Sequence, residues 1–138
     1  MKTNRLIWTA TAGALGAALS LVAQEGPTSV QSGVYSEEQA ERGEKSFGET
    51  CIVCHQPEEF ADGGYMEGWS GQTVDDFVEY IRSTMPEDNP GRLKRSEYID
   101  IVAYFFELNG LPAGDSPMER NHLTKLQIEG PYGESNEH

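Results

Sequence analysis

The sequence predicts an all-α fold with three main helices. Apolar residues from Val74 to Ile81 recur at positions i, i+3, i+4 and i+7, which is the spacing of one helix face. Over residues 96–108 apolar residues cover nearly the whole helical circumference, as they do in a helix that is buried on more than one side. No stretch of the sequence shows a convincing strand pattern.

The first helix is expected to begin after Ser36. Ser36, followed three residues later by Gln39, has the form of a capping box. Ala40, Gly43 and Phe47 are spaced three and four residues apart, so they share one face of this helix. Because glycine lowers helix stability, Gly43 suggests that another segment approaches the helix closely at this point.

The second helix is expected over residues 74–84. Thr73 and Asp76 form its capping signal. It should end at Met85, because the residue before Pro86 is disfavoured in helical geometry.

The third helix is expected over residues 96–108. Asn109 and Gly110 give a stop signal, which Pro112 strengthens. Residues 56–70 are rich in glycine and are expected to be a loop whose large apolar side chains pack against another apolar surface.

The first residues have the features of an export signal. Lys2 and Arg5 are positively charged, an apolar run covers residues 6–22, and small residues offer cleavage after Ser20 or Ala23. The alternative is an uncleaved membrane anchor, although the run is short for a spanning helix. We therefore expect a signal peptide over 1–23, a linker over 24–35, one domain over 36–114 and a polar tail over 115–138.

The protein is strongly acidic. It contains 23 acidic and 10 basic residues, which gives a formal net charge of −13. Removal of a signal peptide with two basic residues would leave 8 − 23 = −15. Such a charge disfavours binding to nucleic acid or to anionic lipid and favours a partner with a basic docking surface.

The residues Cys51, Cys54 and His55 form a C-x-x-C-H motif, and the chain contains no other cysteines. This spacing indicates covalent attachment of a haem, with the histidine as a ligand of the iron. Zinc is the alternative, but a closed zinc site needs four ligands, and the other histidines, His122 and His138, are distant. A redox-active disulfide of the thioredoxin type would need a βαβ setting, which the sequence does not supply.

The second axial ligand decides what a haem in this chain would do. A methionine thioether closes the iron site and suits electron transfer, whereas an open site would permit ligand binding or peroxide chemistry. Met66, Met85 and Met118 are candidates, as are His122 and His138 in the polar tail. The local context favours Met85, because it lies between a helix end and a rigid proline.

Several further motifs accompany C-x-x-C-H. They are Trp69-Ser-Gly-Gln-Thr73, Thr84-Met85-Pro86, Pro90-Gly91-Arg-Leu93, Tyr98-Ile-Asp-Ile-Val-Ala-Tyr104 and Asn109-Gly110-Leu-Pro-Ala-Gly114. With these motifs, residues 36–114 resemble a class I c-type cytochrome of the small bacterial kind. The resemblance implies the cytochrome c fold, in which three main helices surround one covalently bound haem c.

The resemblance also implies individual roles. Cys51 and Cys54 would form the thioether bonds to the haem, His55 would be the proximal iron ligand and Met85 the distal iron ligand. Trp69 would lie near a haem propionate, or would simply pack in the core.

Two further features follow from the resemblance. Gly43 and Phe47 would cross against Ile101 and Tyr104. In the family a Gly-Pro pair commonly follows the haem histidine and supplies a backbone carbonyl that orients its ring, but no such pair follows Gln56 here. The sequence therefore does not indicate which group orients the histidine.

These features predict an exported, periplasmic, bacterial monohaem protein that carries single electrons and is not an enzyme. Its partners would be redox proteins, such as a dehydrogenase or a terminal oxidase, and not small-molecule substrates. Two alternatives stay open. One is a haem ligand-binding or peroxidatic protein, in which Met85 is labile and Arg82 serves as a distal charge. The other is a cytochrome subunit docked in a larger dehydrogenase or oxidase.

Overall fold

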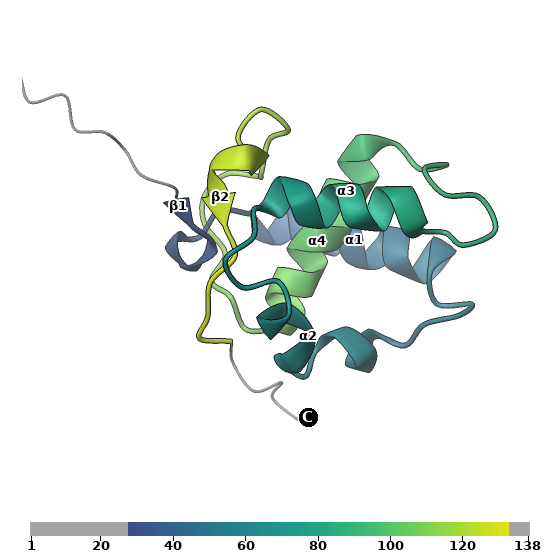
Figure 1. Ribbon diagram of the computed structural model, residues 1–138, viewed down its shortest axis with the longest axis horizontal. Helices are drawn as coiled ribbons and strands as arrows, with labels where there is room; N and C mark the ends of the chain where they lie inside the picture. The colour runs from purple at the N-terminus through teal and green to yellow at the C-terminus, as the bar shows by residue number, and fades with distance from the viewer. Residues whose placement is uncertain (1–27, 133–138) are drawn as a thin grey trace, which may run out of the picture.

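The fold is taken from a computed structural model, which describes residues 28–132. The predicted signal peptide, the first part of the predicted linker and the last residues of the tail, His138 among them, lie outside the described residues. Figure 1 labels the four α-helices and the two strands. In chain order the elements are β1 (Thr28–Ser29), η1 (Val30–Ser32), α1 (Glu37–Thr50), η2 (Pro57–Phe60), α2 (Gly64–Glu67), α3 (Val74–Thr84), α4 (Arg95–Leu108), η3 (Leu123–Lys125) and β2 (Leu126–Gln127).

The all-α prediction is confirmed, with α1, α3 and α4 as the three main helices. The strands β1 and β2 have two residues each and pair in parallel. Helices α1 and α4 cross at Gly43, where an added Cβ would collide with the backbone carbonyl of Asp100 and with Cβ of Tyr104. The expected crossing therefore exists, and the atoms nearest to Gly43 belong to Asp100 and Tyr104 rather than to Ile101.

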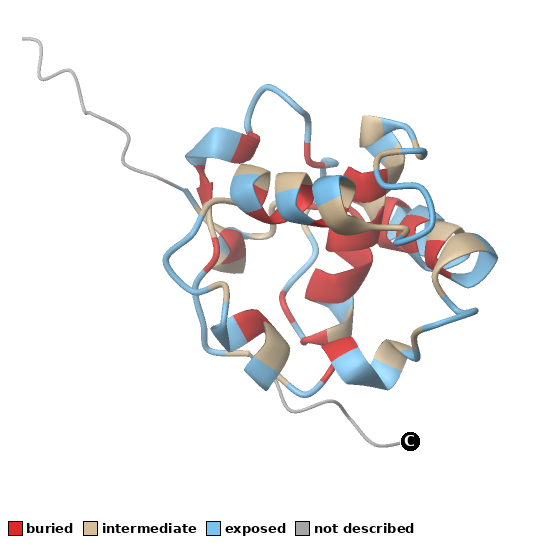
Figure 2. Ribbon diagram, turned by 45° about the vertical axis from the view of Figure 1, so that its right-hand side comes forward, coloured by how far each residue is buried: buried red, intermediate tan, exposed pale blue. Residues whose placement is uncertain are grey.

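The core is centred on α4, which runs through the middle of the molecule and is mostly buried (Figure 2). This agrees with the apolar circumference of its sequence. Phe47 of α1 packs against Tyr104 and Phe105 of α4, with ring centroids 5.8 and 5.9 Å apart. Phe105 also stacks on Phe60 of η2 at 4.5 Å, so α4 contacts both α1 and the segment after the cysteines.

Side-chain caps set the starts of the helices. The Ser36 hydroxyl accepts the backbone N–H of Gln39, as predicted. The side chain of Gln39 does not complete the capping box, because it binds the backbone N–H and C=O of Met118 instead. Thr73 and Asp76 form the predicted reciprocal cap of α3.

Helix α4 begins one residue earlier than predicted. The carboxylate of Glu97 accepts the backbone N–H of Lys94, so Arg95 is the first helical residue. The segment 56–70 is not entirely loop, since it contains η2 and α2.

Parts of the expected linker and of the expected tail pack on the domain. Val30 and Tyr35 are buried, and so are Leu123 and Ile128. The two ends of the described chain meet where β1 pairs with β2. Residues 118–128 of the predicted tail thus lie across the domain. Among residues 28–132, no helix is long and apolar enough to cross a bilayer.

The crossing of α1 and α4 predicts opposite effects of alanine at two glycines of the same helix. Gly43→Ala should lower the free energy of unfolding by about 3 kcal/mol, because the new methyl group collides with a backbone that cannot move aside easily. Gly48→Ala should raise it by about 0.5–1 kcal/mol, because an added Cβ meets no described atom within 4 Å and alanine favours the helix.

Urea unfolding of both variants and the wild type measures the two changes. Equal stability of the Gly43 and Gly48 variants would contradict the close crossing.

Candidate functional site

The C-x-x-C-H motif forms the turn that ends α1. The backbone N–H of Cys51 donates to Phe47 at 2.7 Å, and that of His55 donates to Cys51 at 2.9 Å. Both thiols are free, with Cys51 partly buried against the core and Cys54 exposed. The motif therefore presents two thiols and an imidazole from a single turn at the margin of the apolar core.

Cys51 lies near the loop that follows α3. Burial raises the pKa of the Cys51 thiol, and the positive charge of Arg92 opposes this shift. Arg92 follows Met85 by seven residues. The end of α1 and the loop that carries Arg92 thus share one side of the molecule, and both helices end on the right in Figure 1.

Met85 is the residue that ends α3. Its backbone is extended, and its N–H donates to Ile81 at 2.8 Å. Its carbonyl accepts the Tyr98 hydroxyl of α4 at 2.8 Å and the Gly91 N–H at 3.3 Å. Met85 is partly buried and packs against the core cluster, so α3, α4 and its own loop all position it.

The other candidates for a distal ligand are placed differently. Met66 is fully buried in the core and Met118 is 5% exposed, so both serve as core residues. His122 is exposed in the tail segment, where it contacts Asn121. Met85 thus differs from the other described methionines in lying at the margin of the core.

Trp69 is partly buried and packs beside α3. Its ring centroid lies 4.5 Å from that of Phe77 and 5.1 Å from that of Tyr80. This packing accounts for the large indole, whether or not a propionate lies nearby.

A carboxylate holds His55. Nδ1 of His55 lies 3.1 Å from Oε2 of Glu59, and Oε1 of Glu59 accepts the backbone N–H of Gln56 at 3.0 Å. The hydrogen bond from the Gln56 N–H lowers the pKa of the Glu59 carboxyl most, and the contact with His55 lowers it further. Sequence reasoning missed Glu59, although Pro57 at the first position of a helical turn with an acid two residues later is a recognisable signal.

Ion pairs join α3 to the start of α4. Arg95 of α4 contacts Asp75 at 2.6 Å and also contacts Glu79, both on α3. Glu79 in turn contacts Arg82 at 2.9 Å. Arg82 is therefore engaged in this network, which helps to fix the helix that ends at Met85.

The residues present fit a covalently attached haem. Two thiols lie at the attachment spacing, the Nδ1 contact leaves Nε2 of His55 for an iron, and Met85 offers a thioether from a second helix. Cys51, Trp69 and Met85 all border the same apolar cluster, which suits an apolar macrocycle. Within residues 28–132, no group of three or more His, Cys, Asp or Glu side chains is arranged to hold a metal ion.

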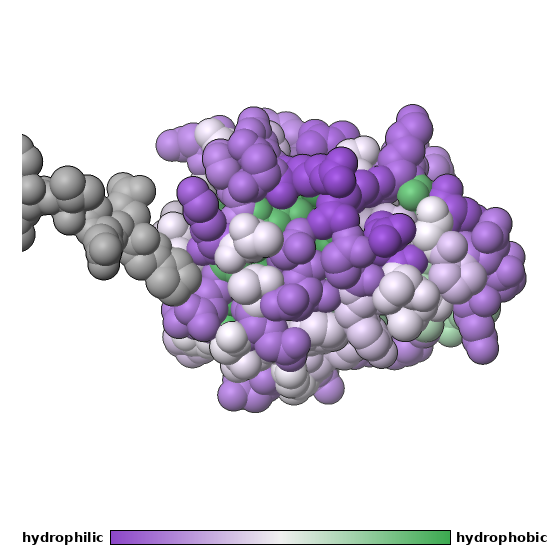
Figure 3. Space-filling view, turned by 45° about the horizontal axis from the view of Figure 1, so that its top comes forward, coloured by the Kyte–Doolittle hydropathy of each residue, from purple (hydrophilic) through white to green (hydrophobic). Residues whose placement is uncertain are grey.

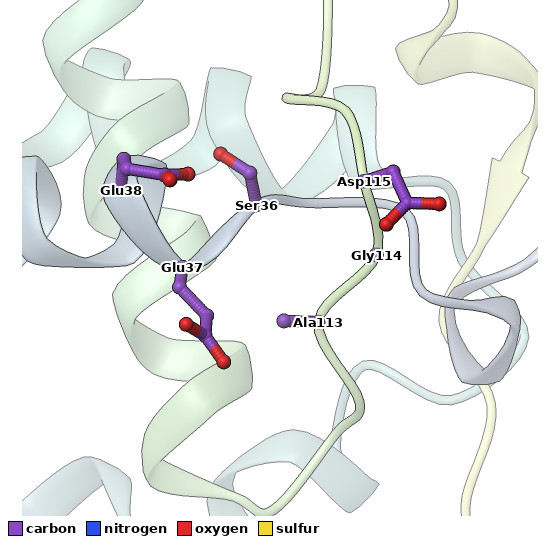
Figure 4. Close-up of a pocket in the computed structure, with 6 residues that line it drawn as sticks. All are labelled: Ser36, Glu37, Glu38, Ala113, Gly114 and Asp115. Atoms are coloured by element: carbon purple, nitrogen blue, oxygen red, sulfur yellow. The ribbon is translucent and has the colours of Figure 1, made fainter.

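A separate pocket lies at the start of α1 (Figure 4). Ser36, Glu37 and Glu38 line it on one side, and the segment 113–115 lines it on the other. Its lining contains no thiol, imidazole or thioether, so this pocket is not part of the candidate haem site.

Comparison with known proteins gives one family match. The family described as "Cytochrome C oxidase, cbb3-type, subunit III" matches residues 38–105, which include Cys51, Cys54, His55 and Met85. No curated protein and no solved structure gave a significant match to the chain.

Removal of the hydrogen bond from Tyr98 to the Met85 carbonyl is predicted to lower the stability of the protein measurably. Tyr98→Phe should lower the free energy of unfolding by about 1 kcal/mol, because the shorter of the two hydrogen bonds to the Met85 carbonyl is lost and only the bond from the Gly91 N–H remains. Tyr80→Phe is the matched control, since Tyr80 is 51% exposed, and it should change stability by less than about 0.5 kcal/mol. Chemical denaturation compares the two, and equal losses would argue against a role of Tyr98 in holding the Met85 segment.

Proposed function

Since the chain belongs to the c-type cytochromes, which bind haem c covalently and take part in electron transfer, we propose that it is an exported monohaem protein that carries single electrons between redox proteins in the periplasm. One observation carries this proposal most directly. The Cys51 thiol at the end of α1 and the Met85 thioether at the end of α3 border one apolar cluster, and the ring of His55 packs against Phe60 of the same cluster.

We assign each residue a role. Cys51 and Cys54 would hold the haem through thioether bonds, and its iron would be held by Nε2 of His55 as the proximal ligand and by the Met85 sulfur as the distal ligand. The bound haem supplies a one-electron couple. If His55 and Met85 both held the iron, no iron position would be left for a substrate, which suits a carrier rather than an enzyme. The apolar surroundings and the neutral thioether both disfavour the extra positive charge of the ferric state and so raise the reduction potential.

The partner is proposed to have a basic docking surface. Glu37, Glu41 and Glu44 of α1 lie close enough to Glu107 of α4 to act on its charge. Burial first, and then these carboxylates, raise the pKa of Glu107. Glu58 joins this acidic surface beside Tyr104, whose pKa is raised chiefly by burial and also by the nearby acids. The face seen in Figure 3 is mostly hydrophilic, with only small hydrophobic areas. A basic partner would relieve the repulsion among these carboxylates and dock faster.

The proposal of export rests on the signal features of residues 1–23. It is consistent with the attachment of c-type haem, which requires an oxidising or externally located compartment. The chain would act in the periplasm as a free protein if the signal is cleaved. It would be held at the membrane if the signal is retained.

A second candidate is a cytochrome subunit docked in a larger oxidase. The description of the matching family, an oxidase subunit, favours it. The described surface offers little support, because its exposed large apolar side chains are Ile52, Val53 and Tyr80. Gel filtration of the protein purified from its native membranes and periplasm separates the two. A free carrier elutes as a small protein, and a docked subunit elutes with oxidase activity.

The assignment of the distal ligand predicts a spectroscopic loss. In the protein produced with haem-maturation machinery, the ferric state should show the methionine-to-iron charge-transfer band, and Met85→Ala should abolish it. Met66→Ala is the control, because that side chain is fully buried. It should keep the band while lowering the free energy of unfolding by about 2–5 kcal/mol.

A band that survives Met85→Ala and disappears in Met66→Ala would show that the ligand is Met66. Rapid binding of carbon monoxide by the reduced wild type would favour the ligand-binding or peroxidatic function instead. A haem-free protein with ordinary thiols would overturn the proposal.

The acidic surface predicts an opposite salt dependence for reagents of opposite charge. Oxidation of the reduced protein by a cationic cobalt complex should accelerate about tenfold or more as ionic strength falls from about 1 M to about 0.01 M. Oxidation by ferricyanide, the anionic control, should slow over the same range. Stopped-flow kinetics measures both rates. A salt dependence of the same sign for both reagents would be incompatible with steering by the protein's negative charge.

A further inference from the structure

We propose that Glu59 is the positioning residue of His55 and that its negative charge strengthens the imidazole as an iron donor. The inference rests on the proposed function, because it takes His55 to be the proximal ligand. It supplies the orienting group that the sequence does not indicate.

The carboxylate of Glu59 is held at two points. Its Oε2 lies 3.1 Å from Nδ1 of His55, and its Oε1 accepts the Gln56 N–H at 3.0 Å. A carboxylate held at both oxygens has little freedom to turn away. Because an anionic carboxylate can only accept, the ring nitrogen that faces it must be the N–H donor. This selects the tautomer with the proton on Nδ1 and leaves the lone pair on Nε2, which is the atom that would bind iron.

The segment that carries Glu59 is anchored to α4. Phe60, the next residue, is buried and stacks on Phe105 at 4.5 Å. Its backbone carbonyl accepts the side-chain amide of Asn109 at 2.6 Å, and Asn109 is itself fully buried. The ring of His55 also packs edge-on against Phe60, with centroids 5.5 Å apart. The core thus holds the backbone on which Glu59 lies and the ring that it contacts.

The chemical consequence follows from the charge of the acceptor. A carboxylate that accepts Nδ1–H draws the proton toward itself and makes the imidazole a stronger donor than a neutral carbonyl acceptor would. A stronger donor favours the ferric over the ferrous state, so Glu59 lowers the reduction potential. This effect opposes the neutral thioether of Met85, which raises it.

This role differs from that of an ordinary surface charge. Glu59 is 51% exposed, so water and salt screen its action through space. The hydrogen bond acts through the bonds of the imidazole and is not screened in the same way. Glu58 is the matched control, because it lies on the same turn, is exposed, and its side chain forms no hydrogen bond or ion pair within residues 28–132.

The test uses the haem-loaded protein and the variants Glu59→Gln, Glu59→Ala and Glu58→Gln. Potentiometric titration at fixed ionic strength gives the ratio of ferrous to ferric protein at one applied potential. Glu59→Gln should raise this ratio about tenfold, in line with the effects of groups that bond to metal ligands. Glu58→Gln should raise it much less. Nuclear magnetic resonance of ¹⁵N-labelled ferrous protein reports the Nδ1–H of His55. Its resonance should shift in Glu59→Gln and exchange faster with water in Glu59→Ala, but stay unchanged in Glu58→Gln.

Equal changes in ratio for Glu59→Gln and Glu58→Gln, with an unmoved Nδ1–H resonance, would overturn the inference and reduce Glu59 to a surface charge. In that case a wild type with attached haem and an intact methionine band would still support the proposed function. A wild type without haem would overturn both. Glu59→Asp controls for a general structural effect of substitution at this position, because it keeps the carboxylate. If the bond to His55 matters, this variant should keep a potential closer to the wild type than Glu59→Gln does.

Discussion

The close crossing of α1 and α4 at Gly43 is the contact on which the rest of the structure depends. Because the backbones meet without a side chain between them, α1 lies against the most buried helix of the protein. The crossing fixes the position of the end of α1 relative to α4, and therefore the position of Cys51 and His55. A larger residue at this point would separate the helices and would move the haem-binding motif away from the core that should receive the haem.

Two sets of contacts connect α4 to the proposed iron ligands. In the first, Asn109 and Phe105 hold the turn that carries Glu59, and Glu59 contacts His55. In the second, the hydroxyl of Tyr98 donates to the carbonyl of Met85. The two sets differ in chemistry, since an anion supports the histidine and a neutral hydroxyl supports the backbone of the methionine. A single helix thus organises both sides of the site, which explains why nearly its whole circumference is apolar.

Sequence reasoning succeeded where the determining interactions are local. The Thr73–Asp76 cap and the Met85-Pro86 stop delimit α3 as expected, because each acts within a few residues. It was less successful with Gln39, whose side chain binds Met118 instead of closing its own helix cap. It also could not place Leu123 and Ile128, which are buried although their surroundings are polar. In each of these cases a partner distant in sequence decided the outcome.

By itself the sequence determined the helical class, the C-x-x-C-H motif and the preference for Met85, because periodicity, spacing and proline are properties of a short stretch of chain. Only the tertiary structure decided that Met66 and Met118 are core residues while Met85 borders the core, since burial is set by what packs from elsewhere. It also brought Glu59 to His55. The two lie only four residues apart, and Asn109 at the end of α4 holds the turn that carries Glu59.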